Sequence, residues 1–290
     1  MKRLAIAVVA ITAISTGAAW AADLPAATYT KAPAIVAPVY SWTGFYVGGD
    51  AGGEWTDAKW TTTCLQPGRA GTVCPGNLPT ILGQNNPSSF NTSGFKGGVY
   101  AGYNWQVSSW VWGFEGDVQW VDAKRTKAGI PGAENFTAAG APGLDSSSIK
   151  ETWDASLRLR GGVLVTPSVL LYGTGGVAFA HVESSAHCQG DFPIGWCFPG
   201  SVFQGLTQTA SSDRVGWTVG AGVEAMIAPN WLLRGEYRYA DYGKFSSTLF
   251  TGSNGIRVNQ DAIAFDTRFH TSTLTVGIAY KFGGPVVARY

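Results

Sequence analysis

Apolar and polar residues alternate with a period of two along much of the chain beyond residue 44. Phe45, Val47 and Ala51 fall on one side of this pattern, and Tyr46 and Asp50 fall on the other. Alternation of this kind is typical of a β-strand with one apolar face. The pattern recurs, which predicts eight strands at Phe45–Trp55, Phe95–Val107, Trp110–Trp120, Trp153–Val165, Val169–His181, Arg214–Ile227, Trp231–Tyr239 and His270–Phe282.

Short and long connections alternate between these strands. The short ones, Ser108–Ser109, Thr166–Ser168 and Ala228–Asn230, suit tight turns. The others are predicted to be long loops at about residues 56–94, 121–152, 182–213 and 240–269. An even strand count with short turns at one end and long loops at the other predicts an all-β fold, an antiparallel up-and-down transmembrane β-barrel of the outer-membrane type. In that layout the loops are extracellular and both termini are periplasmic.

Charged residues within the predicted strands all share the face opposite to the apolar one. A charge that faces the middle of a lipid bilayer costs roughly 2–4 kcal/mol, so the charged face is predicted to line the barrel interior. Seven acids against seven bases favour a hydrogen-bonded plug over a channel with one sign of field. The predicted interior residues are Asp50, Glu54, Lys96, Glu115, Asp117, Asp154, Arg158, Arg160, Arg214, Glu224, Arg234, Glu236, Arg238 and Lys281.

Aromatic residues lie near both ends of the predicted strands. Trp110 and Trp120 bracket the third strand on its apolar face, and ten residues at ~3.3 Å each rise about 25 Å in a tilted strand. This is the height of the apolar band of an outer-membrane barrel, and residues of a soluble sandwich core would not gather at strand ends. The predicted girdles are Trp105, Trp110, Trp231, Tyr280 and Phe282 on the periplasmic side, and Trp55, Trp120, Trp153, Trp217 and Tyr239 on the outer side.

The composition agrees with a barrel in lipid. Lys, Arg, Asp and Glu make up 13% of the 290 residues, about half of the roughly 25% usual in soluble domains. The 39 glycines fit an eight-stranded interior that is only just wide enough for side chains, because inward glycines leave room for large Arg and Glu residues. A net charge of +1 gives no basic surface for nucleic acid.

The first 21 residues are predicted to be a secretory signal peptide. Lys2 and Arg3 precede an uncharged stretch, and the small-x-small pattern Ala19-Trp20-Ala21 follows. Cleavage there would leave residues 22–43 as a Pro/Ala-rich periplasmic segment, 44–282 as the barrel and 283–290 as a periplasmic extension. The alternative is an uncleaved membrane helix, since Leu4–Ala22 carries no charge in 19 residues and a span needs about 20.

Four cysteines form two close pairs in the sequence, Cys64 with Cys74 and Cys188 with Cys197. After a signal peptide they indicate an oxidising compartment, and we expect a disulfide within each pair because both lie in turn-forming stretches. Free thiols or a metal site are the alternatives, although neither pair has the C-x-x-C spacing that zinc favours. No metal site and no cofactor site is predicted.

One pair of residues raises the question of catalysis. His270 and Ser272 lie two apart on the predicted lipid-facing side, and a His-x-Ser pair there resembles the one that lipid A deacylase barrels use. No acid follows in the same stretch to orient the histidine, so we expect no enzymatic activity. The loop aromatics Trp60, Phe90, Phe192 and Trp196 are expected to pack over the barrel mouth, with anchoring of a partner as the alternative.

Five further segments are informative, namely Ala22–Pro25, Pro38–Gly49, Leu171–Ala178, Gly235–Tyr239 and Val276–Phe282. They resemble segments of the alphaproteobacterial outer-membrane immunogenic proteins, which are related to the opacity-type porin superfamily. The resemblance implies an outer-membrane barrel that contributes to envelope integrity and to surface or host contact through its loops. Its implied partners are outer-membrane lipid, the barrel-assembly machinery and host or surface ligands. A small-solute diffusion porin is the alternative function. Phe282 resembles the aromatic of an assembly signal, although Gly283–Tyr290 follows it.

Overall fold

A computed structural model of the chain describes residues 40–65, 86–132, 144–190, 203–250 and 263–283. The predicted signal peptide, Cys74, Cys197, Phe192, Trp196 and residues 284–290 lie outside the described residues. No described helix is long and apolar enough to cross a membrane. The strands are β1 (Gly44–Leu65), β2 (Ser88–Val107), β3 (Trp110–Ala128), β4 (Ser146–Thr166), β5 (Val169–His187), β6 (Thr207–Ala228), β7 (Trp231–Leu249) and β8 (Ile263–Lys281).

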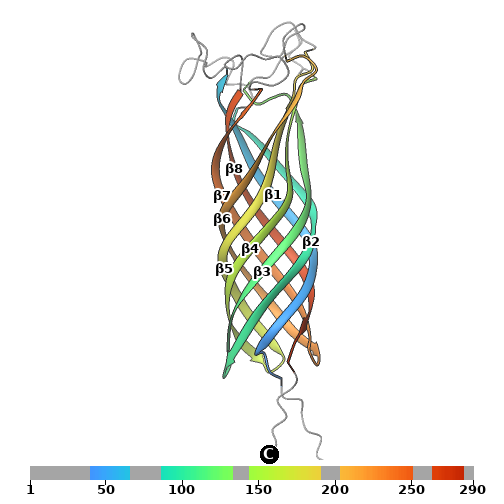
Figure 1. The fold of residues 1–290 in the computed structure, drawn as a ribbon, viewed down its shortest axis with the longest axis vertical. Coiled ribbons are helices and arrows are strands. Elements are labelled where there is room, and N and C mark those ends of the chain that lie inside the picture. Colours follow the sequence, from blue (N-terminus) through green and yellow to red (C-terminus); the bar gives the residue numbers. More distant parts are fainter. Residues whose placement is uncertain (1–39, 66–85, 133–143, 191–202, 251–262, 284–290) are drawn as a thin grey trace, which may run out of the picture. The chain divides into compact units, whose positions relative to one another are not determined.

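The eight strands close into a barrel (Figure 1). Each strand pairs antiparallel with the next one in the chain, and β8 pairs with β1. Ring closure leaves no open sheet edge in the closed part, which is what strands in hydrocarbon need because lipid cannot hydrogen-bond to the backbone. The predicted eight-stranded up-and-down barrel is confirmed. We call the end with the three tight turns the turn end and the opposite end the loop end.

Apolar side chains cover the outside of the barrel between the two girdles of aromatic residues. Leu159 is 73% exposed and Val219 is 47% exposed. Nine of the ten predicted girdle residues are at least 37% exposed, and Tyr239 is half-buried. At the turn end Tyr280 contacts both Trp231 and Phe282, with ring centroids 5.4 Å and 5.1 Å apart. A continuous exposed apolar band of this kind fits a lipid environment.

All eight strands continue beyond the loop-end girdle, so the prediction of long loops at residues 56–94, 121–152, 182–213 and 240–269 is wrong over much of each range. β1 runs on to Leu65 and β2 begins at Ser88. The strand prediction stopped too early because the polarity of the two faces reverses there. Outward positions become polar, as at Thr63 and Ser211, whereas Trp60 and Phe265 point inward and are 0% exposed.

The continuous backbone ladder also opens beyond the girdle, at two seams. Pairing of β2 with β3 ends at Phe95–Asp122, and pairing of β6 with β7 ends at Trp217–Asp241. The remaining registers join β7, β8, β1 and β2 into one sheet and β3, β4, β5 and β6 into another. We call this two-sheet part the loop-end extension; it comprises residues 56–65, 88–94, 123–128, 146–152, 182–187, 207–216, 242–249 and 263–271.

Local features of the sequence explain where the seams begin. Gly94 and Gly216 are the first residues beyond the last paired ones, and a Cβ at either would lie 2.8–2.9 Å from a Cα of the facing strand. Across each seam, β3 and β7 carry a bulge, at Trp120/Ala123 and at Asp241/Lys244. A bulge increases the local twist and bends its strand, which turns β3 and β7 away from their former partners.

A cation over an aromatic ring bridges each seam. The Lys127 Nζ of β3 lies 5.4 Å from the ring centroid of Phe90 in β2, and the Arg214 guanidinium of β6 lies 4.0 Å from that of Phe245 in β7. These contacts hold the two sheets together where their backbones no longer pair.

The two sheets of the loop-end extension enclose an apolar core. Trp60 stacks on Phe265 with centroids 3.8 Å apart, and Phe90 lies beside Trp60. Ile149 and Val182 come from the opposite sheet and belong to the same buried cluster. Trp60 and Phe90 therefore lie in strands and pack into this core, rather than lying in loops that cover the barrel mouth. The strands thus have an apolar outward face within the lipid band and an apolar inward face in the loop-end extension.

This reversal predicts opposite labelling of two cysteine variants on one face of β6. In the protein reconstituted in vesicles, Ser211→Cys should react with a water-soluble maleimide, because its position faces water. Val219→Cys, eight residues along on the same outward face, should react only after denaturation, because lipid covers it. The wild-type protein supplies the background, since no described cysteine is a free thiol. Equal labelling of both variants would contradict the assigned boundary of the lipid band.

Candidate functional site

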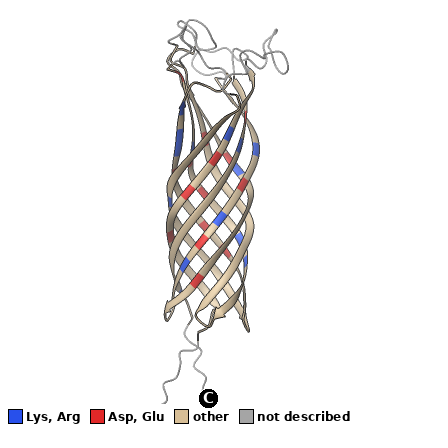
Figure 2. Ribbon diagram, turned by 180° about the vertical axis from the view of Figure 1, so that it is seen from behind, with Lys and Arg blue, Asp and Glu red and all other residues tan. Residues whose placement is uncertain are grey.

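The interior of the described barrel consists of three layers along the strands. β7 shows them in order: Leu232 lies at the turn end, Arg234 and Arg238 in the middle, and Phe245 in the loop-end extension, all of them buried. The turn-end layer gathers Trp42, Tyr46, Tyr100, Leu170, Tyr172 and Leu232. The charged layer thus lies between two apolar layers, and Figure 2 shows acidic and basic positions recurring through the middle of the barrel.

Glu115 is the centre of the charged layer. Its Oε1 accepts a 2.7 Å bond from Arg158 Nη2, and its Oε2 accepts one of 2.7 Å from Arg234 and one of 3.3 Å from Arg160. The Tyr46 hydroxyl also donates to Oε2 at 2.7 Å. Charge-assisted bonds from three guanidinium groups offset the cost of removing one carboxylate from water.

A chain of ion pairs leads from this centre towards the loop end. Arg238 donates to both Asp117 and Asp154 at 2.8 Å. Lys96 is bonded to Asp154 and, at 2.8 Å, to Glu54. The side chains in these pairs are at most 9% exposed. The pairs therefore interact in a medium that screens them far less than water does.

Aromatic rings form the turn-end boundary of the network. The Arg234 guanidinium lies 3.4 Å from the ring centroid of Tyr100, and the Arg160 guanidinium lies 4.2 Å from that of Tyr172. Trp42, just before β1, is 0% exposed and donates from Nε1 to the carbonyl of Pro167 in a turn. Stacking on aromatic faces suits guanidinium groups, which are planar and weakly hydrated.

Inward glycines make room for these large side chains. A Cβ at Gly102 would overlap the Tyr46 hydroxyl, and one at Gly222 would lie 2.6 Å from the Tyr172 hydroxyl. The outward Gly235, in contrast, has open space around it. The glycine content therefore serves the narrow interior, as the sequence predicted.

The structure brings together twelve of the fourteen predicted interior residues. The seven acids and the bases Lys96, Arg158, Arg160, Arg234 and Arg238 all take part in buried ion pairs. Arg214 instead bridges the β6–β7 seam. Lys281 is buried at the turn end, where its Nζ is 3.5 Å from the carbonyl oxygens of Thr43 and Gly283.

Glu151 belongs to the interior as well and was missed by the sequence pattern. A bulge at Glu151/Trp153 puts both Glu151 and Asp154 inside, although they are three residues apart. With Glu151 the network contains eight acids against five bases among the described residues. The expectation of an equal balance is therefore wrong, and the excess of three negative charges needs protons or cations to neutralise it.

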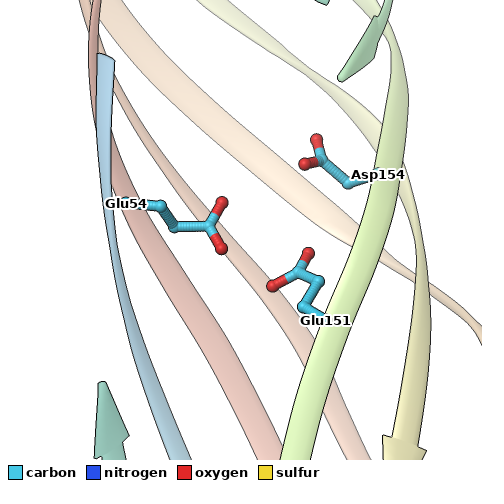
Figure 3. Close-up of side chains that lie close together, drawn as sticks. All are labelled: Glu54, Glu151 and Asp154. Atoms are coloured by element: carbon cyan, nitrogen blue, oxygen red, sulfur yellow. The ribbon is translucent and has the colours of Figure 1, made fainter. Parts of the chain in front are cut away.

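The excess is concentrated at Glu54, Glu151 and Asp154, whose carboxyl groups point towards one another (Figure 3). One oxygen from each lies within 4.8 Å of the others, which is a spacing that a metal ion could bridge. Lys96, however, already bonds Glu54 and Asp154 with its ammonium group. A proton on Glu151 would therefore remove one of the three excess negative charges without a divalent ion.

The candidate catalytic pair lies on the outward face, as the pattern indicated. The Ser272 hydroxyl accepts a bond of 3.2 Å from Tyr237. No acid follows His270 within its own strand, but Asp57 on β1 lies 3.4 Å from its Nε2. The sequence did not reveal this acid because the contact is made across two strands far apart in the chain.

Neither Cys64 nor Cys188 is a free thiol. Cys74 and Cys197 lie outside the described residues, so the pairing within each cluster stays a prediction.

The fold, the lipid-exposed band and the buried network together define an integral β-barrel membrane protein. The family model described as outer membrane protein beta-barrel domain matches residues 7–282, and the chain belongs to that family. It is 31% identical to the 31 kDa outer-membrane immunogenic protein of Brucella melitensis, over 97% of this chain and all of the relative. It is also 31% identical to the 22 kDa outer membrane protein of Rhizobium leguminosarum bv. viciae, over 86% of this chain and 82% of the relative.

Among solved structures, Neisserial surface protein A is similar at 15% identity, covering 83% of this chain and 98% of the other, with a TM-score of 0.36.

The acid excess predicts that two charge-removing substitutions at the same cluster act in opposite directions. Lys96→Met leaves Glu54 and Asp154 undercompensated and should lower the free energy of unfolding by about 3–5 kcal/mol. Glu151→Gln removes an excess acid and keeps a hydrogen-bond donor, so stability should stay equal or rise. Urea unfolding in vesicles, followed by tryptophan fluorescence, measures both.

Glu183→Gln on the outward face is the matched control and should change stability by less than about 0.5 kcal/mol. Destabilisation by Glu151→Gln as large as that by Lys96→Met would show that the Glu151 carboxylate is needed, for example by a bound cation.

Proposed function

We propose that this protein is a non-conducting, non-enzymatic outer-membrane surface barrel. Its loop end faces the cell exterior and its termini face the periplasm. It contributes to envelope integrity through its lipid-embedded wall and to surface or host contact through the loop-end extension and the loops beyond it. The observation that carries the proposal is the buried charge network enclosed between two apolar layers.

The network argues against a diffusion porin. Its side chains cross from strand to strand, as Arg234 of β7 does when it bonds Glu115 of β3 and Asp50 of β1. Such bonds span the interior of an eight-stranded barrel and leave the described lumen filled by side chains. Apolar layers above and below add further barriers to ions and water.

The extension supports a role at the surface. It carries strands past the lipid on a rigid two-sheet scaffold, and its outward face is polar. Binding residues are often placed on loops that a rigid scaffold positions. The Brucella relative is named an immunogenic protein, and surface exposure of the loop end would be consistent with that name.

A conductance measurement distinguishes a barrel with a plugged interior from a barrel with an open pore. In planar bilayers the wild-type protein should show no stable open level, and Arg234→Ala should reduce resistance to heat denaturation in a gel-shift assay because it leaves Glu115 and Asp50 undercompensated. Arg268→Ala, which removes an exposed charge on the outward face, is the matched control and should behave as wild type. A stable open level of porin size in the wild-type protein would overturn the proposal.

Orientation and cellular role need a separate measurement. Ser211→Cys should be labelled by a membrane-impermeant maleimide on intact cells if the loop end is external. A deletion strain should be assayed separately for envelope leakage and for adhesion. Normal behaviour in both assays, or labelling only after the outer membrane is disrupted, would contradict this part of the proposal.

A further inference from the structure

Three outward-facing basic residues just beyond the loop-end girdle have acidic partners on one side of the barrel. On β7, β8 and β1, Lys244 pairs with Asp266 at 2.8 Å and Arg268 with Asp241 at 3.7 Å. His270 lies 3.4 Å from Asp57 on the same side. Lys244, Arg268 and His270 therefore have acidic partners here, whereas the exposed Lys59 of β1, directly opposite Arg268, has no ion pair among the described residues.

The opposite side, on β3 and β4, carries two neighbouring lysines that make no ion pair among the described residues. Lys124 of β3 and Lys150 of β4 stand directly opposite each other in the register. Directly opposite residues have Cβ atoms about 4.5–5.5 Å apart, and like charges in that position are destabilising. Glu183 of β5 stands directly opposite Lys150, and the exposed Asp122 precedes Lys124 by two residues on the same face, but no ion pair joins either lysine to an acid among the described residues.

Two exposed tryptophans lie directly on the lipid side of this basic pair. Trp120 and Trp153 are opposite each other in the same register, and they are 62% and 37% exposed. Indole rings favour the boundary between hydrocarbon and headgroups. Lys124 follows Trp120 by four residues, about 10 Å along the membrane normal for a tilted strand, which places its ammonium group in the headgroup layer.

An apolar hollow lies on the lipid side of the two tryptophans, on the same face. It has a volume of about 410 Å³, and small residues of three neighbouring strands, Ala101, Gly116 and Ala155, line it together with Val118, Leu157 and Phe179. The hollow is open to the outside of the barrel, where acyl chains of the bilayer lie. A basic pair, an indole pair and an acyl-sized hollow thus follow one another along β3 and β4.

We infer that this face binds one phosphorylated glycolipid of the outer leaflet. Lys124 and Lys150 would hold its phosphate, Trp120 and Trp153 would pack at the junction of headgroup and acyl chains, and one chain would fill the hollow at Gly116. The choice of leaflet rests on the proposed function, because it requires the loop end to be external. The two lysines provide the counter-charge that an anionic headgroup needs.

The test measures glycolipid binding to the full-length protein in nanodiscs of phosphatidylcholine, with rough-type lipopolysaccharide as the probe. Native mass spectrometry counts bound glycolipid. Lys124→Gln with Lys150→Gln should weaken binding about tenfold or more, since each lysine near a lipid headgroup contributes about 1 kcal/mol. Lys244→Gln with Arg268→Gln removes the same charge from the other side and should leave binding unchanged.

Gly116→Leu tests the hollow, because it fills the floor without changing charge. Glycolipid binding should become weaker in this variant. The ability of inorganic phosphate to compete with the glycolipid should stay the same. Unchanged gel mobility before and after heating shows that each variant is folded. Equal weakening by the two double variants, or equally tight binding of phosphatidylglycerol, would overturn the inference. Because binding in nanodiscs does not depend on orientation in cells or on conductance, its failure is distinguishable from failure of the proposed function.

Discussion

The constraint on which this structure depends is that a backbone in hydrocarbon must satisfy its own hydrogen bonds. Within the lipid band every strand pairs on both sides, and the ring is closed. Beyond Trp217 and close to Trp120 the ring opens at two seams, because water can hydrogen-bond to a free edge there. The position of the seams therefore marks the edge of the membrane as clearly as the tryptophans do.

The same change of solvent explains both kinds of core. Within the band, lipid is as apolar as a side chain, so burying apolar residues inside the barrel gains little and the interior can be ionic. In the extension water surrounds the strands, and apolar burial at Trp60 and Phe265 again drives packing. In the ionic layer every charge requires a partner, whereas in the apolar layers the side chains only have to fill the available space. Their stacking along each strand stabilises the charged layer, because both layers keep water from it.

Much of this was predictable from the sequence. Period-two alternation identified the strands and the interior face, since in lipid the two faces differ as strongly as possible. Strand ends were not predictable, because the criterion of an apolar outward face fails where the outside is water. Glu151 was missed because the bulge beside Trp153 shifts the parity of the strand by one residue. Asp57 beside His270 was missed because cross-strand contacts depend on register, which alternation alone does not fix.

The excess of acids in the interior has a structural consequence. Each guanidinium of the network already serves several carboxyl groups, as Arg158 does with Glu115, Asp117 and Glu236. Because each guanidinium is shared between carboxyl groups, the network can contain fewer bases than acids. This requires that some of the acids stay protonated or bind a cation. The shortage lies at Glu54 and Glu151, next to the extension, and not around Glu115 near the barrel centre. The charge state of the plug is therefore least fixed beside the loop-end extension, whereas its centre is held by permanently charged arginines.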